Sequence, residues 1–160
     1  MEIKRCCFTG HRRIPPSHMH ALPLHIDGAL DAFYRVGCRD FYTGGAIGFE
    51  TLAAERVVAY RETHPGVRLI LLLPCRDQYK EWCAQDVRAY FDILNACDAY
   101  RYVSEEYDAQ AMYRRNMELV GVAQACIAYV SREASGAGQT MRAAARAGLT
   151  VINLATRFAE

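Results

Sequence analysis

Two kinds of hydrophobic pattern alternate along this chain. Short, nearly continuous apolar runs are typical of strands buried on both faces of a parallel sheet. Between them lie longer segments whose apolar residues recur every three or four positions, as in helices that pack on one face. The pattern predicts strands over residues 3–8, 41–43, 67–73, 99–103, 125–130 and 150–154. It predicts helices over residues 22–36, 49–63, 77–95 (in one or two pieces), 109–122 and 140–148.

This alternation indicates the fold class. Strands separated by helices form right-handed βαβ crossovers, which place helices on both faces of a parallel sheet. We therefore predict a three-layer Rossmann-like α/β sandwich with a mostly parallel sheet of five to six strands and the first strand near its centre. A length of 160 residues with 52% hydrophobic content fits a single domain over residues 1–160. In such folds ligands bind beyond the carboxyl ends of the strands, where the strand order reverses.

Composition narrows the classes of function. Nineteen basic and 18 acidic residues leave a formal charge of +1. With no basic tail or charge run, electrostatics favour neither a nucleic-acid partner nor a membrane surface. The apolar runs are far shorter than a membrane span and no signal peptide is visible, so we expect a cytoplasmic protein.

Cysteines and histidines give no metal or disulfide pattern. The seven cysteines are an odd number and contain no C-x-x-C pair, which argues against a disulfide framework and a structural zinc site. His18, His20 and His25 are closely spaced, but no neighbouring carboxylate or cysteine completes a ligand set. No metal is expected.

A glycine-rich turn joins the second predicted strand to the helix that follows. It contains Gly44, Gly45, Ala46 and Gly48, and Glu50 lies in the first turn of the helix. Glycines let a backbone approach a ligand closely, and the N–H groups at a helix N-terminus attract anions. The same turn would also serve as a tight structural connection, and the turn alone does not distinguish the two roles.

Two further loops are predicted to reach the same edge of the sheet. The first follows the first strand and contains Thr9, Gly10, His11, Arg12 and Arg13. The other opens the last helix and contains Ser135, Gly136, Gly138, Gln139 and Thr140. Backbone N–H groups, hydroxyls and guanidinium groups together suit a phosphate. His11 is either a phosphate ligand or acid–base group near neutral pH, or part of a solvated basic loop. The chain has neither G-x-G-x-x-G after the first strand nor G-x-x-x-x-G-K-[ST], so the usual dinucleotide and P-loop fingerprints are missing.

The ordered set Thr9-Gly10-His11, Gly44-Gly45-Ala46-Ile47-Gly48, Arg115-Asn116 and Gly136-Ala137-Gly138-Gln139-Thr140 resembles the SLOG superfamily. That group is named after DprA and the LOG enzymes, and the resemblance is greatest to its small, YpsA-like bacterial branch of poorly characterised proteins. It implies a Rossmann-like fold that binds a nucleotide or nucleotide-derived ligand, and it implies a homodimer. The phosphate cradle would include Gly10, Gly44, Gly45, Gly48, Gly138 and Thr140. Arg115 and Asn116 would approach the ligand from the fourth helix.

One departure bears on catalysis. LOG enzymes carry P-G-G-x-G-T-x-x-E, and the matching loop here begins at Ser135 without the proline and is followed by no glutamate. Glu50 and Arg115 are the remaining catalytic candidates, and whether any reaction is catalysed stays open.

Three functions follow from these observations. The first is binding of a nucleotide in a sensory or regulatory role, with no other cofactor. The alternative is a phosphoribohydrolase-like N-glycosidase acting on a nucleoside monophosphate. The third is a single-stranded DNA-binding module, which the balanced charge does not favour. Tyr107 and Tyr113 flank a loop at the binding edge and are the candidates for stacking on a base.

Overall fold

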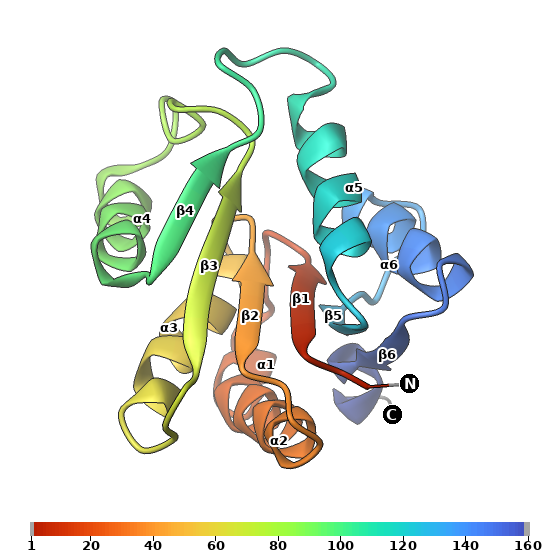
Figure 1. Ribbon diagram of the computed structural model, residues 1–160. Coiled ribbons are helices and arrows are strands. Elements are labelled where there is room, and N and C mark those ends of the chain that lie inside the picture. Colours follow the sequence, from red (N-terminus) through yellow and green to blue (C-terminus); the bar gives the residue numbers. More distant parts are fainter. Residues whose placement is uncertain (1, 159–160) are drawn as a thin grey trace.

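The computed structural model describes residues 2–158 and contains one six-stranded, all-parallel sheet with the order β4-β3-β2-β1-β5-β6. Figure 1 shows the arrowheads of β1, β2, β3 and β4 pointing the same way. The strands are β1 (Arg5–Gly10), β2 (Asp40–Thr43), β3 (Arg68–Leu73), β4 (Ala99–Tyr102), β5 (Ala125–Tyr129) and β6 (Thr150–Asn153). The predicted three-layer, Rossmann-like α/β fold with a central first strand is confirmed.

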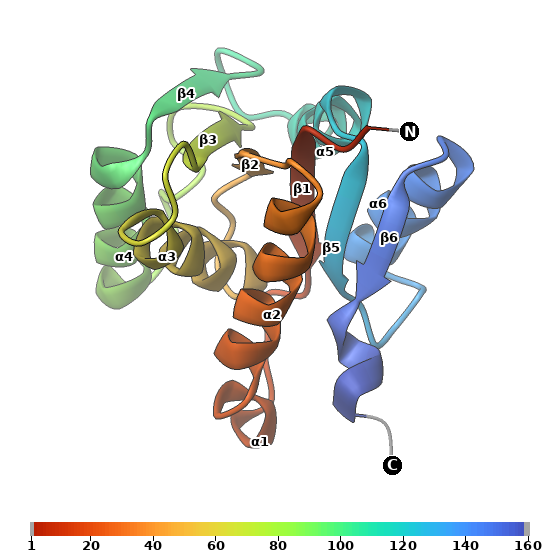
Figure 2. The same ribbon diagram turned by 60° about the horizontal axis from the view of Figure 1, so that its bottom comes forward.

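Helices cover both faces of the sheet, as Figure 2 shows. One face carries α2 (Leu22–Arg35), α3 (Phe49–Arg61) and α4 (Ala84–Ala96), and the other carries α5 (Ala111–Val122) and α6 (Gly136–Arg146). The short helix α1 (Pro16–Met19) precedes α2, and the 3-10 helix η1 (Leu154–Phe158) follows β6. No helix among residues 2–158 is long and apolar enough to cross a membrane.

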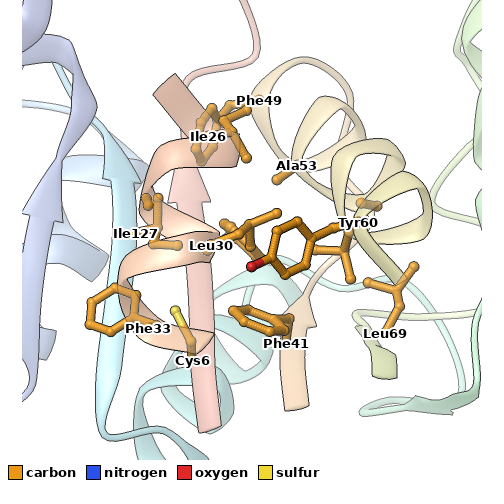
Figure 3. Close-up of a cluster of buried hydrophobic side chains, with 14 of the residues drawn as sticks. Cys6, Ile26, Leu30, Phe33, Phe41, Phe49, Ala53, Tyr60, Leu69 and Ile127 are labelled. Carbon is orange, nitrogen blue, oxygen red and sulfur yellow. The ribbon is translucent and has the colours of Figure 1, made fainter. Parts of the chain in front are cut away.

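The larger core lies between the sheet and the first group of helices (Figure 3). Phe8 of β1, Phe41 of β2 and Leu69 of β3 meet Leu30 of α2 and Phe49 of α3, and all five side chains are buried. A smaller core on the opposite face includes residues of β1 and β5 and of the helices α5 and α6. Burial on both faces explains why β1, β3 and β5 have nearly continuous apolar sequences.

The last helix was predicted to begin at Thr140, but α6 begins at Gly136, because the Ser135 side chain caps it there. Besides such shifts of element bounds, the structure differs from the predicted elements in three places. Residues 77–83 form consecutive turns instead of the start of a helix, since the Lys80 and Trp82 N–H groups donate to the carbonyls of Asp77 and Tyr79. Tyr79 and Trp82 both pack against Tyr90, so their spacing reflects packing against one buried ring. The short helices α1 and η1 were not predicted.

The strand order places a switch point between β1 and β5. From β1 the chain adds β2, β3 and β4 on one side, and it then returns through α5 to add β5 and β6 on the other. The connections leaving β1 and β5 therefore diverge from adjacent strand ends, where folds of this type bind ligands.

Candidate functional site

A cavity of about 390 Å³ opens at this switch point, and we call it the switch cavity. Its walls are the loops after β1, β2 and β5 and the N-terminal parts of α3, α5 and α6. The lining residues are Thr9, Gly10, His11, Arg12, Arg13, Ala46, Glu50, Met112, Arg115, Asn116, Arg132, Ser135, Gly136 and Ala137. The three loops predicted to converge thus do meet in one place.

Arg115 is the central charged group of the switch cavity. Its side chain is 1% exposed, which is rare for arginine. Its Nη1 donates to the Gly44 carbonyl at 2.6 Å, and its Nε donates to Asn116 Oδ1 at 2.7 Å. Glu50, which is also buried, places its Oε1 3.6 Å from Nη1. The fold therefore fixes a guanidinium group at the cavity wall before any ligand binds.

His11 connects the loops through both its backbone and its ring. Its Nε2 accepts hydrogen bonds from the N–H groups of Ser131 and Arg132, at 2.9 and 3.2 Å, so the proton of the neutral ring is on Nδ1. Its carbonyl accepts from the Phe49 N–H at the start of α3. Burial, and secondarily the charge of Arg132, lower the pKa of His11 below its usual value. A neutral His11 thus holds the three loops together.

The glycines of the turn after β2 allow neighbouring loops and side chains to pack closely against it. A Cβ at Gly44 would lie 1.7 Å from Nη1 of Arg115, and one at Gly48 would lie 2.2 Å from the carbonyl oxygen of Arg12. Gly45 and Gly48 have φ of +73° and +84°, which other residues rarely adopt. The Ala46 N–H donates to the Glu50 carboxylate. Of the turn, Ala46 lines the switch cavity, whereas Gly44, Gly45 and Gly48 do not.

At the start of α6, too, some of the predicted site residues line the switch cavity and others do not. Ser135 is the N-cap, and its Oγ accepts from the Gly138 N–H at 2.9 Å. Thr140 is buried and donates to the Gly136 carbonyl within the helix. Gly138, Gln139 and Thr140 therefore lie outside the lining, whereas Ser135 and Gly136 belong to it. The first-turn N–H groups of a helix have no partners within the helix, so this end of α6 suits an anion.

Charge in the switch cavity is strongly one-sided. The cavity is lined by four guanidinium groups and one carboxylate, those of Arg12, Arg13, Arg115 and Arg132 and that of Glu50. Their formal charges sum to +3, whereas the total for the chain is +1. The sequence-based set omits Arg132, although it lies two residues after the fifth predicted strand and topology alone places it at this edge. Met112 and Ala137, also omitted, carry no chemical signal in the sequence.

Within residues 2–158 there is no group of three or more His, Cys, Asp or Glu side chains that could hold a metal ion. Cys75, which follows β3 near the ligand edge, is fully buried, and burial raises its pKa. It is therefore a poor nucleophile in this conformation.

Comparisons with known proteins agree with this architecture. A model of the YspA SLOG family matches residues 16–150. A UPF0398 protein of Halalkalibacterium halodurans is 31% identical over 107 residues, which are 64% of this chain and 57% of that protein. The SPbeta prophage-derived protein YoqJ of Bacillus subtilis is 28% identical over 108 residues, which are 60% of this chain and 63% of that protein. The matches therefore span less than two thirds of either relative's length.

Two solved structures share the fold at low sequence identity. DNA processing protein A from Helicobacter pylori, for which a single-stranded DNA binding mode is described, has a TM-score of 0.64 at 17% identity, covering 94% of this chain and 64% of that one. DNA processing protein A from Streptococcus pneumoniae has a TM-score of 0.67 at 18% identity, covering 93% of this chain and 49% of that one. At these identities the likeness concerns the fold.

Proposed function

This chain belongs to the YspA SLOG family, and we propose that it binds a nucleotide or nucleotide-derived ligand, with the ligand's phosphate in the switch cavity. The observation that carries the proposal is the surplus of guanidinium groups around one buried arginine. Arg115 is held by two hydrogen bonds, while Arg12, Arg13 and Arg132 are exposed at the rim. Arginine is the side chain best suited to bidentate contacts with phosphate oxygens.

The geometry favours binding over hydrolysis. A carboxylate that serves as a general base or nucleophile must reach the substrate. The carboxylate of Glu50 is buried, accepts from the Ala46 N–H at 3.3 Å and faces Arg115. Although Glu50 lines the switch cavity, its carboxylate is thus held by partners within the protein. We propose a sensory or regulatory role in which the ligand is bound and released unchanged.

Calorimetric titration with AMP, ADP, ADP-ribose, NAD and cyclic nucleotides tests this proposal. Arg132→Ala is the informative variant because Arg132 is exposed and lines the switch cavity. Loss of one charge-assisted hydrogen bond, worth about 1.5–3 kcal/mol, should weaken binding roughly tenfold or more. Arg88→Ala is the control, since Arg88 is an exposed arginine of α4 that does not line the switch cavity.

The outcomes separate the alternatives. A tight ligand recovered intact, with affinity lost in Arg132→Ala and kept in Arg88→Ala, supports the binding function. Release of free base from a nucleoside monophosphate would replace it with the phosphoribohydrolase-like activity. Binding that is equally strong in both variants, or absent for every nucleotide, would refute the site.

Single-stranded DNA binding is a second candidate, favoured by the fold shared with DNA processing protein A from Helicobacter pylori and by two exposed tyrosines. Tyr107 and Tyr113 are 64% and 44% exposed, and exposed aromatic rings beside arginines are typical of stacking surfaces for single strands. Fluorescence anisotropy with a labelled oligonucleotide tests it. Affinity that falls steeply with added salt supports DNA binding, and no change in anisotropy at low salt excludes it.

A further inference from the structure

A second, larger cavity of about 740 Å³ adjoins the switch cavity, and we call it the side cavity. It lies against the turns after β3 and the loop between β4 and α5, which Figure 1 shows beyond the upper ends of these strands. Arg12 and Met112 line both cavities, so the two share a wall. A ligand that reaches past Arg12 would enter both.

The charges of the two cavities are opposite in sign. The side cavity is lined by the carboxylates of Asp77, Glu81 and Asp86, against Lys80 and the shared Arg12, which leaves a formal charge of −1 where the switch cavity has +3. Carboxylates accept hydrogen bonds from amino and hydroxyl groups and repel phosphate. The pair of cavities therefore fits a ligand with an anionic end and an uncharged end rich in N–H and O–H donors.

Aromatic rings complete the side cavity. Trp82 lines it, and its ring packs edge-on, with centroids 5.6 Å apart, against the fully buried ring of Tyr90, so its orientation is fixed by the core. Tyr107 lines it from the β4–α5 loop. That loop is tied to α5 by Arg114, which donates to Ser104 and Asp108. A planar heterocycle that enters here meets rings on which it can stack.

One backbone group links the walls of the two cavities. The Gly44 carbonyl accepts from Arg115, which lines the switch cavity, and from Gln78 Nε2 at 3.2 Å, which lines the side cavity. The glycine turn therefore holds Arg115 and Gln78, one from the wall of each cavity, at a fixed distance from each other.

We infer that the side cavity binds the aromatic base of the ligand whose phosphate occupies the switch cavity, so that the ligand is a nucleoside 5′-phosphate lying across Arg12. This inference rests on the proposed function. Trp82 and Tyr107 stack on the base, and the carboxylates of the side cavity accept from its amino group and from ribose hydroxyls. A ligand without a base, such as ribose 5-phosphate, fills the switch cavity alone.

The chain's single tryptophan makes this inference directly measurable. Trp82 emission, excited at a wavelength that nucleotides do not absorb, is recorded while AMP or ribose 5-phosphate is added, with calorimetry in parallel. We expect AMP to change the emission saturably, and ribose 5-phosphate to compete with AMP while leaving the emission unchanged. Base stacking should make AMP about five- to 150-fold tighter than ribose 5-phosphate.

Two tyrosine variants provide the matched comparison. Tyr107→Leu should weaken AMP by at least threefold and leave ribose 5-phosphate unaffected. Tyr113→Leu changes an exposed tyrosine that lines neither cavity, and it should alter neither affinity. Because Tyr107 is 64% exposed, its replacement should leave the fold intact.

Failure of this inference is distinguishable from failure of the proposed function. If AMP binds by calorimetry and needs Arg132, but Trp82 emission is unchanged and Tyr107→Leu has no effect, the base lies elsewhere and the phosphate site stands. If Tyr107→Leu weakens both ligands equally, the side cavity does not recognise the base. If neither ligand binds, the phosphate site itself falls, and this inference with it.

Discussion

Gly44→Ala tests whether the buried arginine of the switch cavity is held as the structure indicates. The added methyl group would lie 1.7 Å from Nη1 and 2.2 Å from Cζ of Arg115, so the guanidinium group must move. Backbone conformation does not oppose the substitution, because Gly44 is not in the left-handed region. The effect of this variant therefore measures the packing of Arg115 against Gly44.

The magnitude follows from the contacts that Arg115 would lose. Its hydrogen bond to the Gly44 carbonyl is charge-assisted, and such bonds contribute about 1.5–3 kcal/mol. Displacing the guanidinium group also leaves the carboxylate of Glu50, which is 5% exposed, without its partner, and breaking a buried pair costs about 3–5 kcal/mol. These losses overlap, and the lower chain entropy of alanine in the unfolded state offsets about 0.4–1 kcal/mol. We expect a net loss of about 3 kcal/mol, or roughly 6–12 °C in Tm for a chain of this size.

Urea denaturation at 25 °C gives the free energy of unfolding for a double-mutant cycle of Gly44→Ala and Arg115→Ala. With the guanidinium group removed, the methyl group has room, so Gly44→Ala should cost far less in the Arg115→Ala background. Gly28→Ala is the control, because a Cβ there meets nothing within 4 Å in the middle of α2, and it should stabilise by about 0.5–1 kcal/mol. Equal costs of Gly44→Ala in both backgrounds would refute the placement of Arg115.

Two further predictions concern the loops around the switch cavity. Gly138→Ala should destabilise the protein, since its Cβ would lie 2.2 Å from a backbone carbonyl of the preceding loop. Gly136→Ala should not, because the space around Gly136 is open. Thermal unfolding compares the two variants, and equal Tm values would contradict the close approach at Gly138. Burial, and then the charge of Arg132, lower the pKa of His11 in the folded protein below its ordinary value of about 6.5. As the pH decreases through this value, the unfolded state binds more protons than the folded state, so the free energy of unfolding decreases. His11→Gln should flatten the loss of unfolding free energy between pH 7.5 and 5.5, whereas His20→Gln at an exposed position should leave the slope as it is, and identical slopes for all three proteins would exclude this role.

Hydrophobic periodicity is sufficient to predict the fold of this chain, because each strand buried on both faces has its own continuous apolar run. Residues 77–83 show the limit of this reasoning. Tyr79 and Trp82 have helical spacing, yet the segment forms turns because both rings pack against Tyr90 from the next helix. The spacing of residues in the sequence indicates that their side chains point in the same direction. It does not indicate whether a helix or consecutive turns place them there.

The glycines of the candidate site mark a different limit. A missing Cβ admits either a ligand or another part of the protein, and the sequence is the same in both cases. Gly10, Gly44 and Gly48 make room for Phe49, for Arg115 and for the backbone of Arg12, whereas a Cβ at Gly136, which lines the switch cavity, would meet nothing within 4 Å. The positions of the loops were predictable from strand topology, but the side of each loop that faces the cavity was not.

The arginines of the switch cavity differ in burial, and this difference decides how binding experiments should be interpreted. Arg115 is buried and held by two hydrogen bonds, to the Gly44 carbonyl and to Asn116, so replacing it changes stability and the shape of the site together. Arg12, Arg13 and Arg132 are exposed, so each can reorient toward a ligand and its replacement changes mainly the local charge. Attraction by exposed charges is screened by salt, while a group fixed in a buried wall is screened much less. A ligand phosphate held by both kinds should therefore lose the contribution of the rim as salt rises and keep that of Arg115, which leaves a salt-resistant remainder of affinity in Arg132→Ala.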